Sequence, residues 1–335
     1  MLEVNQFDIP VALFMFKREH KTAEIVKRIG EVRPTKLYLI ADGARNEQEA
    51  VAVKRTRDAV EQAIDWDCEI VKNYAQSNRG VYRNIGEGAK WVLSQEESAI
   101  FLEDDNMPEL TFFDYCRELL EKYKDNERVL WICGTNYLGK YNTPYSYMFT
   151  QNLLPCGWAS WSHKFLKYYD GQLETFNPET DRKSLRKAYR NKALAKQDFN
   201  NFCVEKERAT EGKSFVSWDY QMAYTIRKYD LLGISPCNNQ IKNIGIDSES
   251  IHGGTSFASV MTQRLCGMDS YPIEFPLKHP QSTRIDKKYE RIVSNILLIP
   301  FNIRLRIAVL KVLRKLLGLK KGEHLRDIFK IRGRK

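Results

Sequence analysis

Short apolar runs alternate with helix-forming segments through the first hundred residues, and this alternation constrains the fold more than any other feature. Four runs have the length and composition of buried strands: 11–16, 36–41, 68–71 and 99–102. Helix-forming segments separate them, at 22–29, at about 46–64 and before Leu93. Strands that alternate with helices form a mostly parallel sheet covered by helices on both faces. We therefore expect an α/β fold.

Polar side chains follow three of these apolar runs. Lys17 and Arg18 follow the first, Asp42 precedes Gly43 after the second, and the fourth ends in three consecutive acids, Glu103, Asp104 and Asp105. In open sheets of this class, ligands bind beyond the carboxyl ends of the strands. The sequence therefore predicts that these groups surround one ligand site.

The acidic triplet has two interpretations. Three adjacent carboxylates repel one another unless a cation lies between them, and hard divalent cations such as Mg²⁺ or Mn²⁺ prefer oxygen ligands. The triplet thus indicates a metal site. It is also compatible with an acidic loop whose aspartates cap the helix expected at 110–123.

Beyond a fifth strand expected at 129–133, the chain carries a segment rich in Gly and Trp at 151–161. Trp158 there has an indole face on which a sugar can stack, although core packing accounts for it equally well. Residues 170–212 are charged and helix-prone, as in a lid or an insertion that faces an acceptor. Asp219 lies near the start of another expected helix, and His252 lies in a loop rich in polar residues and glycine.

Composition places the chain among soluble globular proteins, with 43% hydrophobic and 29% charged residues in 335. Its seven cysteines are scattered without a C-x-x-C pair, which is typical of a reducing cytosol. The first residues carry neither a basic nor an apolar signal region, and no apolar run reaches the ~18 residues of a membrane span. We expect a cytoplasmic protein.

The basic charge of the chain is concentrated near its end. Residues 284–335 hold sixteen Lys or Arg against four acids, whereas the whole chain has a net charge of only +10. We therefore expect a catalytic domain over 1–280 and a basic tail over 281–335.

The tail also has an amphipathic pattern. On a helical wheel one side carries the basic residues Arg304, Lys311, Arg314 and Lys315, and Arg306 departs from the pattern. The other side carries the apolar residues Leu305, Val309, Val312, Leu313 and Leu316. Such a helix suits an anionic membrane surface. Docking on its own domain or on a partner protein remains an alternative, and nucleic acid is disfavoured because aromatic stacking residues are scarce after Phe301.

In order along the chain, the motifs resemble those of GT-A glycosyltransferases, which use nucleotide sugars. The closest resemblance is to bacterial relatives of the N-acetylglucosaminyltransferase that initiates hybrid N-glycans. It covers roughly residues 9–260 and rests on the following ordered motifs: Phe16-Lys-Arg18, Ala41-Asp-Gly43, Asn78-Arg-Gly80, Leu102-Glu-Asp-Asp-Asn106, Gly157-Trp158, Ser217-Trp-Asp219 and His252-Gly253. Lys17 departs from the family pattern, where a smaller polar residue is usual.

The resemblance implies a GT-A fold, Rossmann-like and mostly parallel, and a role for several residues. Arg18 and Asp42, together with Glu103 and Asp104, would hold the nucleotide sugar. The resemblance implies that this donor is a UDP-sugar. Asp105 would bind Mn²⁺ or Mg²⁺, with His252 close to the metal or the diphosphate. Asp219 would be the catalytic base of a hexosyl- or N-acetylhexosaminyltransferase. The resemblance does not place an acceptor site. From the basic tail we expect a peripheral enzyme at the inner face of the cell membrane, with a saccharide or a lipid-linked saccharide as acceptor.

Elementary chemistry agrees with those roles. A departing nucleoside diphosphate needs its charge offset, which a carboxylate-bound divalent cation does. The attacking sugar hydroxyl has a high pKa, so a carboxylate must accept its proton, and a base opposite the leaving group gives inversion. Arg79 and Arg83 are candidates for further cationic contacts to the diphosphate, or they are surface or structural charges. Each other role has a plain alternative: Asp42 as a turn former, Asp219 as a helix N-cap, His252 as a loop residue.

Three functions remain open. The leading one is a metal-dependent, inverting glycosyltransferase of glycan or polysaccharide biosynthesis. A sugar nucleotidyltransferase on the same fold is disfavoured because residues 16–20 lack the glycine-rich phosphate loop that it needs. The third is a sugar- or membrane-binding protein that has lost catalysis on this scaffold.

Overall fold

The computed structural model describes residues 7–246 and 260–317. It divides the chain into two compact units, 1–297 and 298–335, and each is treated by itself. The strands are β1 (Val11–Met15), β2 (Lys36–Ala41), β3 (Glu69–Tyr74), β4 (Ser98–Glu103), β5 (Asn106–Pro108), β6 (Val129–Cys133), β7 (Tyr147–Thr150), β8 (Trp158–Trp161), β9 (Leu232–Pro236) and β10 (Ile241–Asn243).

The helices of the first unit begin with α1 (Glu19–Gly30), α2 (Glu47–Ala63), a π-helical segment η1 (Tyr82–Glu87) and α3 (Gly88–Leu93). They continue with α4 (Thr111–Lys122), α5 (Ser162–Tyr168), α6 (Asp181–Ala188), α7 (Lys192–Thr210), α8 (Asp219–Lys228), α9 (Val260–Cys266) and α10 (Lys287–Leu297). The second unit contains α11 (Phe301–Leu316).

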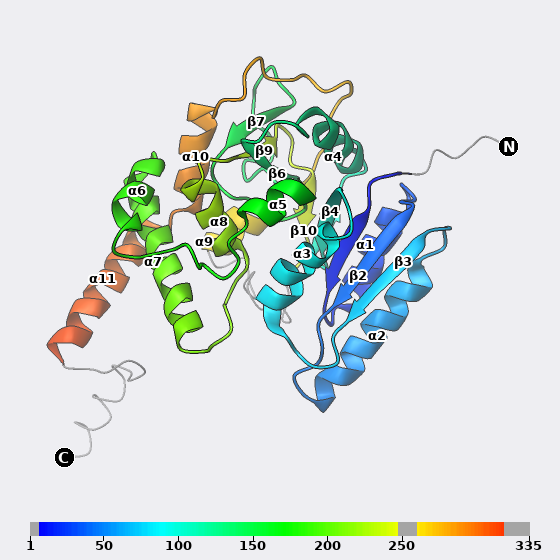
Figure 1. The fold of residues 1–335 in the computed structure, drawn as a ribbon, viewed down its shortest axis with the longest axis horizontal. Helices are drawn as coiled ribbons and strands as arrows, with labels where there is room; N and C mark the ends of the chain where they lie inside the picture. The colour runs from blue at the N-terminus through cyan, green and yellow to red at the C-terminus, as the bar shows by residue number, and fades with distance from the viewer. Residues whose placement is uncertain (1–6, 247–259, 318–335) are drawn as a thin grey trace. The chain divides into compact units, whose positions relative to one another are not determined.

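An eight-stranded mixed sheet, in the order β3-β2-β1-β4-β8-β6-β9-β7, forms the centre of the first unit (Figure 1). Strands β1 to β4 run parallel to one another, as the alternating pattern predicted. β8 is antiparallel to both β4 and β6, and β7 is antiparallel to β9. The expected α/β class, a mostly parallel mixed sheet flanked by helices, is confirmed.

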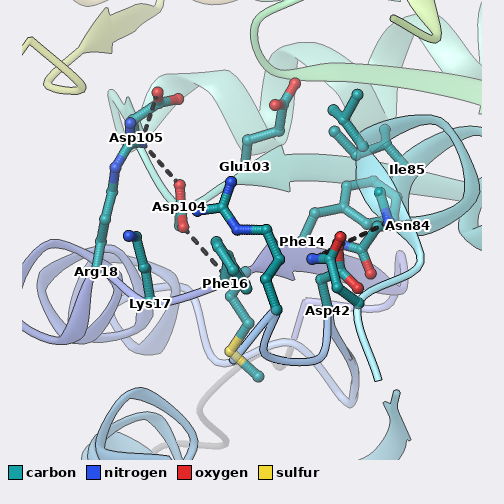
Figure 2. Close-up of a pocket in the computed structure, with 15 residues that line it drawn as sticks. Phe14, Phe16, Lys17, Arg18, Asp42, Asn84, Ile85, Glu103, Asp104 and Asp105 are labelled. Carbon is teal, nitrogen blue, oxygen red and sulfur yellow. Dashed lines mark hydrogen bonds and ion pairs between the residues drawn. The ribbon is translucent and has the colours of Figure 1, made fainter. Parts of the chain in front are cut away.

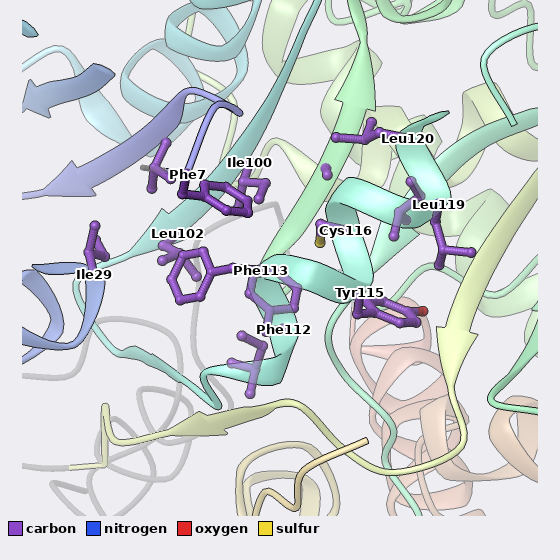
Figure 3. Close-up of a cluster of buried hydrophobic side chains, with 14 of the residues drawn as sticks. Phe7, Ile29, Ile100, Leu102, Phe112, Phe113, Tyr115, Cys116, Leu119 and Leu120 are labelled. Carbon is purple, nitrogen blue, oxygen red and sulfur yellow. The ribbon is translucent and has the colours of Figure 1, made fainter. Parts of the chain in front are cut away.

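Two hydrophobic clusters lie on the two faces of this sheet. Because side chains alternate along a strand, Val11, Leu13 and Met15 of β1 enter one cluster, whereas Ala12 and Phe14 enter the other. The first cluster also contains apolar residues of α1 and α4, several of which Figure 3 draws. The second contains apolar residues of α3, α8 and α10. All five residues of β1 are buried, which is why its sequence is continuously apolar.

In the second half of the sheet, neighbouring strands are far apart in the sequence. β8 inserts between β4 and β6, and residues 151–161, which we interpreted as a sugar platform or core, end in this strand. A small antiparallel pair, β5 with β10, continues directly from the acidic triplet, so Pro108 belongs to a short edge strand.

The first unit extends further than the domain boundary that we expected at residue 280. Tyr289 and Val293 of α10 are buried in the second hydrophobic cluster, so residues 281–297 pack as part of the first unit. The tail as a separate unit therefore begins at Leu298. Its described part, residues 298–317, contains one helix, α11. No helix in the described residues is both long and apolar enough to cross a membrane.

Candidate active site

The carboxyl ends of β2, β1 and β4 meet at one edge of the sheet, and a cavity of about 280 Å³ lies there. Its lining residues come from the ends of these strands and the turns after them, from the loop before η1 and from η1 itself (Figure 2). They include Arg18, Asp42 and all three acids of the triplet. The sequence predicted that these groups surround one site, and the topology places them together.

Arg18 lies between the last two acids of the triplet. Its Nη1 donates to Oδ1 of Asp104 at 3.0 Å and to Oδ2 of Asp105 at 2.9 Å. Neighbouring carboxylates repel one another unless a cation lies between them, and the sequence predicts a metal ion in that place. In this structure the Arg18 guanidinium is a cation that pairs with two of the three carboxylates.

Further hydrogen bonds, from donors other than Arg18, fix the carboxylates of Asp104 and Asp105. The backbone N–H of Phe16 donates to Oδ2 of Asp104 at 3.2 Å. Asn106 Nδ2 donates to Oδ1 of Asp105 at 2.6 Å, and Asn106 in turn accepts from the backbone N–H of Gly157 at 2.8 Å. The Gly157-Trp158 motif thus supports the orientation of Asp105 through a buried asparagine.

Burial strongly affects the protonation of this cluster. The pKa of Glu103 lies well above its ordinary value, first because the carboxyl is buried and then because Asp105, Asp104 and Asp219 are nearby negative charges. Burial also raises the pKa of Asp104 to about 6, although the adjacent Arg18 opposes this shift. A cation bound beside these carboxyls would favour their ionised forms and lower their pKa values.

Asp42 ties the end of β2 to the loop before η1. Its Oδ1 accepts from the backbone N–H groups of Gly43 and Arg79, each at 2.7 Å. Its Oδ2 accepts from Asn78 Nδ2 at 2.9 Å and from the backbone N–H of Gly80 at 3.1 Å. The carboxylate therefore shapes the cavity wall, which is more than a turn former does. The predicted contact between Asp42 and the nucleotide stays a prediction.

Gly43 allows the loop to approach this closely. A Cβ at residue 43 would lie 2.3 Å from the backbone carbonyl carbon of Ser77. Any other residue would push the loop away from Asp42.

The two arginines considered for the diphosphate do not line the cavity. Arg79 lies along the loop, where Nε and Nη2 donate to Oδ1 of Asn84 at 3.0 and 2.8 Å and Nη1 donates to Oδ1 of Asn73 at 3.0 Å. Arg83 is exposed. For both, the structural alternative fits the observed positions, and the predicted contacts to the diphosphate have no support here.

Sequence reasoning missed a second cationic group at the cavity. Arg45 lines it, and both Arg45 and Lys17 pair with Glu49 of α2; the Lys17 Nζ to Glu49 Oε1 distance is 3.1 Å. The hydrogen bond from Arg45 is the main reason that the pKa of Glu49 falls to about 2. Arg45 follows the strand end by four residues in a polar loop, a position that no periodic pattern marks.

Asp219 is the first residue of α8 rather than its N-cap, which is Trp218. Its Oδ1 is shielded from solvent and, among the described residues, has no hydrogen-bond partner. Burial raises the pKa of Asp219 to about 6, although backbone hydrogen bonds at the start of the helix oppose the shift. Asp219 is also close enough to Glu103 to raise the pKa of that carboxyl. A shielded carboxylate that titrates near neutrality can act as a proton acceptor.

The prediction that Trp158 contacts the nucleotide sugar is wrong. Trp158 is 1% exposed, and its ring lies between Phe101, at a centroid distance of 4.0 Å, and Trp131, at 4.1 Å. Both indole faces are therefore covered by other rings, and no sugar can stack on them. The core-packing alternative is the correct one.

The backbone after β10 approaches the triplet from the opposite side. The N–H of Ile244 donates to the carbonyl oxygen of Asp105 at 2.8 Å, and Lys21 Nζ donates to the carbonyl oxygen of Ile244 at 2.6 Å. A Cβ at Gly245 would lie 2.2 Å from Oδ2 of Asp105. His252 lies outside the described residues, so its predicted role near the metal stays a prediction.

The donor set at the triplet fits a hard divalent cation in part. Asp105 offers a carboxylate oxygen that already contacts a cationic group, the Arg18 guanidinium. Within the described part of the chain, no three acidic, histidine or cysteine side chains form a metal-binding group by themselves. Mg²⁺ is commonly held by one or two carboxylates, water and the phosphates of a substrate, and that partial set fits here.

Comparisons with known proteins give little beyond the fold. No protein-family model matches the sequence, and no curated protein matches it. One solved structure that matches is "The Crystal Structure of UDP-glucose pyrophosphorylase complexed with UDP-glucose", with a TM-score of 0.32 and 10% sequence identity, over 70% of this chain and 91% of that chain. A likeness at that level does not distinguish among the functions that α/β sheets of this kind support.

Proposed function

We propose that this protein is a metal-dependent, inverting glycosyltransferase that moves a sugar from a nucleotide-diphosphate donor, a UDP-sugar, to a saccharide or lipid-linked acceptor. The observation that carries the proposal is the convergence of Arg18, Asp104 and Asp105 on one cavity at the carboxyl edge of the sheet. Asp219, a second and separately buried carboxylate, lies within electrostatic range of that cluster.

The donor would occupy the cavity. Its lining combines the cationic side chains of Lys17, Arg18 and Arg45 with the loop that Asp42 organises. Cationic side chains bind the diphosphate through charge-assisted hydrogen bonds, and the loop supplies polar groups for the base or the ribose. Asp105 would hold Mn²⁺ or Mg²⁺, and this ion when bound offsets the charge of the departing nucleoside diphosphate.

Asp219 would remove the proton from the attacking hydroxyl. Its Oδ1 has no hydrogen-bond partner among the described residues, so a sugar hydroxyl that reaches it would meet an unused acceptor. Its pKa of about 6 leaves it ionised at neutral pH and still basic enough for proton transfer. A single base that acts opposite the leaving group gives inversion at the anomeric carbon.

The test of this proposal measures which product the protein releases. We expect the purified protein with Mn²⁺ to release a nucleoside diphosphate from one of a panel of nucleotide sugars, and to release it faster with the correct acceptor. A sugar nucleotidyltransferase would instead form pyrophosphate from UTP and a sugar 1-phosphate. A scaffold without catalysis would produce neither product, and either of these results would refute the transferase.

We further infer that the tail attaches the enzyme to the inner face of the cell membrane. The observation that favours this is the helix α11, which spans the segment predicted to be amphipathic. Phe301, Leu305, Val309, Val312 and Leu316 recur at helical spacing along it and form an apolar stripe. Basic residues beside an apolar stripe match an anionic lipid surface.

Truncation tests the tail without disturbing the first unit. A chain that ends at Leu297 retains α10, whereas a shorter one would remove buried residues such as Tyr289. We expect the full chain to sediment with vesicles that contain phosphatidylglycerol. With neutral phosphatidylcholine vesicles, the chain should stay in the supernatant. Equal sedimentation of the truncated chain with anionic vesicles would show that the tail is not the attachment site.

A further inference from the structure

The guanidinium of Arg18 and a divalent cation would compete for the same carboxylate oxygen. Nη1 of Arg18 is 2.9 Å from Oδ2 of Asp105, and the other oxygen of that carboxylate is engaged by Asn106 Nδ2 at 2.6 Å. The backbone of Gly245 adjoins Oδ2 from another side, where a Cβ would come within 2.2 Å of it. Little space for a further ligand is left around Oδ2, because the Arg18 guanidinium and the backbone of Gly245 both lie close to this oxygen.

The arrangement around Arg18 is held in place before any ligand binds. The carbonyl oxygen of Arg18 accepts from the backbone N–H of Thr22 at 2.9 Å and from its hydroxyl at 2.6 Å, which fixes residue 18 at the start of α1. Asp104 is fixed by the N–H of Phe16 and by Nη1 of Arg18. The side chains of Arg18, Asp104 and Asp105 are only 12, 14 and 20% exposed. The ion pairs are therefore partly shielded from solvent and from screening by salt.

We propose that Arg18 is an internal counterion that keeps divalent cations off Asp105 until a nucleoside diphosphate binds. This inference rests on the proposed function, because it assigns Asp105 to the cation and the cavity to the nucleotide. A cation that arrives alone must displace the guanidinium and leave it without an anionic partner at Oδ2. A diphosphate in the same cavity offers Arg18 new anionic oxygens, so the displacement costs less when both ligands are present.

The consequence is thermodynamic coupling between the two ligands. If the diphosphate favours release of Asp105 by Arg18, it raises the affinity for the cation, and by linkage the cation raises the affinity for the diphosphate by the same factor. The protein would then bind its donor as a complex with the cation, and free cation alone would occupy the site weakly. Arg18 would affect the cation through Asp105 and would contact the diphosphate directly.

The test measures binding of Mn²⁺ by electron paramagnetic resonance, which detects free Mn²⁺ and needs no turnover. Titrations are made with the full chain, with and without UDP, for the wild type and for Arg18→Met. The matched control is Lys54→Met, which also removes one positive charge but breaks an exposed pair with Asp58 on α2, at a residue that does not line the cavity. Asp105→Asn reports whether the bound Mn²⁺ depends on Asp105.

We expect UDP to raise the affinity of the wild type for Mn²⁺ by about tenfold or more. Without UDP, Arg18→Met should bind Mn²⁺ about tenfold more tightly than the wild type, and UDP should add little to that affinity. Lys54→Met should keep the dependence on UDP that the wild type shows. Arg18→Lys keeps the charge but cannot bridge two carboxylates with a planar group, so its affinity for free Mn²⁺ should lie between those of the wild type and Arg18→Met. If thermal unfolding shows that Arg18→Met does not fold, Arg18→Lys takes its place in the test.

Two results would overturn the inference, and they are distinguishable. If the wild type binds Mn²⁺ with UDP in a manner that depends on Asp105, but Arg18→Met binds free Mn²⁺ no better than the wild type, Arg18 is not the counterion and the proposed function stands. If Mn²⁺ binding does not depend on Asp105 in any variant, both the metal site of the proposed function and this inference are refuted.

Discussion

Arg18 and Asp105 lie 87 positions apart in the chain, yet Nη1 of the one is 2.9 Å from Oδ2 of the other. The contact exists because β1 and β4 are parallel neighbours, which brings the residues that follow each strand to the same edge. It balances charge in a cluster where burial has raised the pKa values of Glu103 and Asp104. In the further inference above, a divalent cation replaces Arg18 at this contact once a diphosphate binds.

Replacement of Asp219 by Asn separates binding from catalysis. The amide keeps the size of the side chain but cannot accept a proton from a hydroxyl, so we expect transfer to fall by about 10²- to 10⁴-fold. Binding of UDP with Mn²⁺ should stay as in the wild type, because Asp219 does not line the donor cavity. Asp114→Asn, at an exposed position on α4, is the control and should leave the rate unchanged. Transfer at the rate of the wild type in Asp219→Asn would remove it as the base.

The pH dependence of transfer follows from the same carboxyl. The pKa of Asp219 is about 6, and only its ionised form accepts a proton, so kcat/KM should rise with pH and level off above that value. At pH 5 we expect roughly a tenth of the plateau. A profile that falls between pH 5 and pH 7 would contradict the assignment.

The same pKa gives a prediction for stability. A carboxyl whose pKa is higher in the folded protein than in the unfolded chain costs stability once it is ionised, and this cost disappears as the pH falls below its ordinary pKa. Asp219→Asn should therefore raise the free energy of unfolding at pH 8, by about 1–3 kcal/mol, and should change it little at pH 3. Urea denaturation at the two pH values measures the difference.

Gly245→Ala tests the contact between the backbone after β10 and the metal candidate. The added Cβ would come within 2.2 Å of Oδ2 of Asp105, so the carboxylate or the backbone must move. We expect the affinity for Mn²⁺ with UDP to fall by about tenfold or more, as for other changes that misorient a ligand. The control is Gly233→Ala in β9, where the nearest atom would be 3.7 Å away. Equal affinities in the two variants, measured by calorimetry, would show that residue 245 does not position Asp105.

A buried ion pair joins α10 to α8 within the first unit. Nη2 of Arg227 is 3.0 Å from Oε1 of Glu290, and the two side chains are 2% and 1% exposed. Arg227→Met leaves the Glu290 charge buried without this partner, so we expect a loss of about 3–5 kcal/mol in the free energy of unfolding. Lys54→Met, which breaks an exposed pair with Asp58 on α2, should cost at most about 1 kcal/mol. Similar midpoints for the two variants in urea would contradict the structural role of the pair.

Much of the first half of the fold was predictable because its information is local. Runs such as Val11–Met15 are apolar on both sides of the strand, and each is followed by a helix, which together specify parallel pairing. Parallel pairing then places Arg18, Asp42 and the triplet at one edge. That inference needed no distances, only the rule that the carboxyl ends of parallel strands coincide.

The remainder depended on contacts between distant parts of the chain. Trp158 could not be placed from its own segment, because its partners Phe101 and Trp131 come from two other strands. Arg18 could not be recognised as the partner of Asp105 without the register of β1 against β4. The expected start of the tail, residue 281, lies too early in the chain. Residues of α10 are basic in composition like the tail, but this helix packs in the second hydrophobic cluster.

The central claim is that the cavity at the strand ends binds a nucleoside diphosphate together with a divalent cation held by Asp105. Calorimetric titration of the wild type and of Asp105→Asn with UDP, with and without Mn²⁺, tests it most directly. The account predicts saturable binding at one site per chain with Mn²⁺, and loss of the Mn²⁺-dependent part in Asp105→Asn. Binding that is the same in both proteins, or no binding of UDP or any other nucleoside diphosphate under either condition, would contradict it.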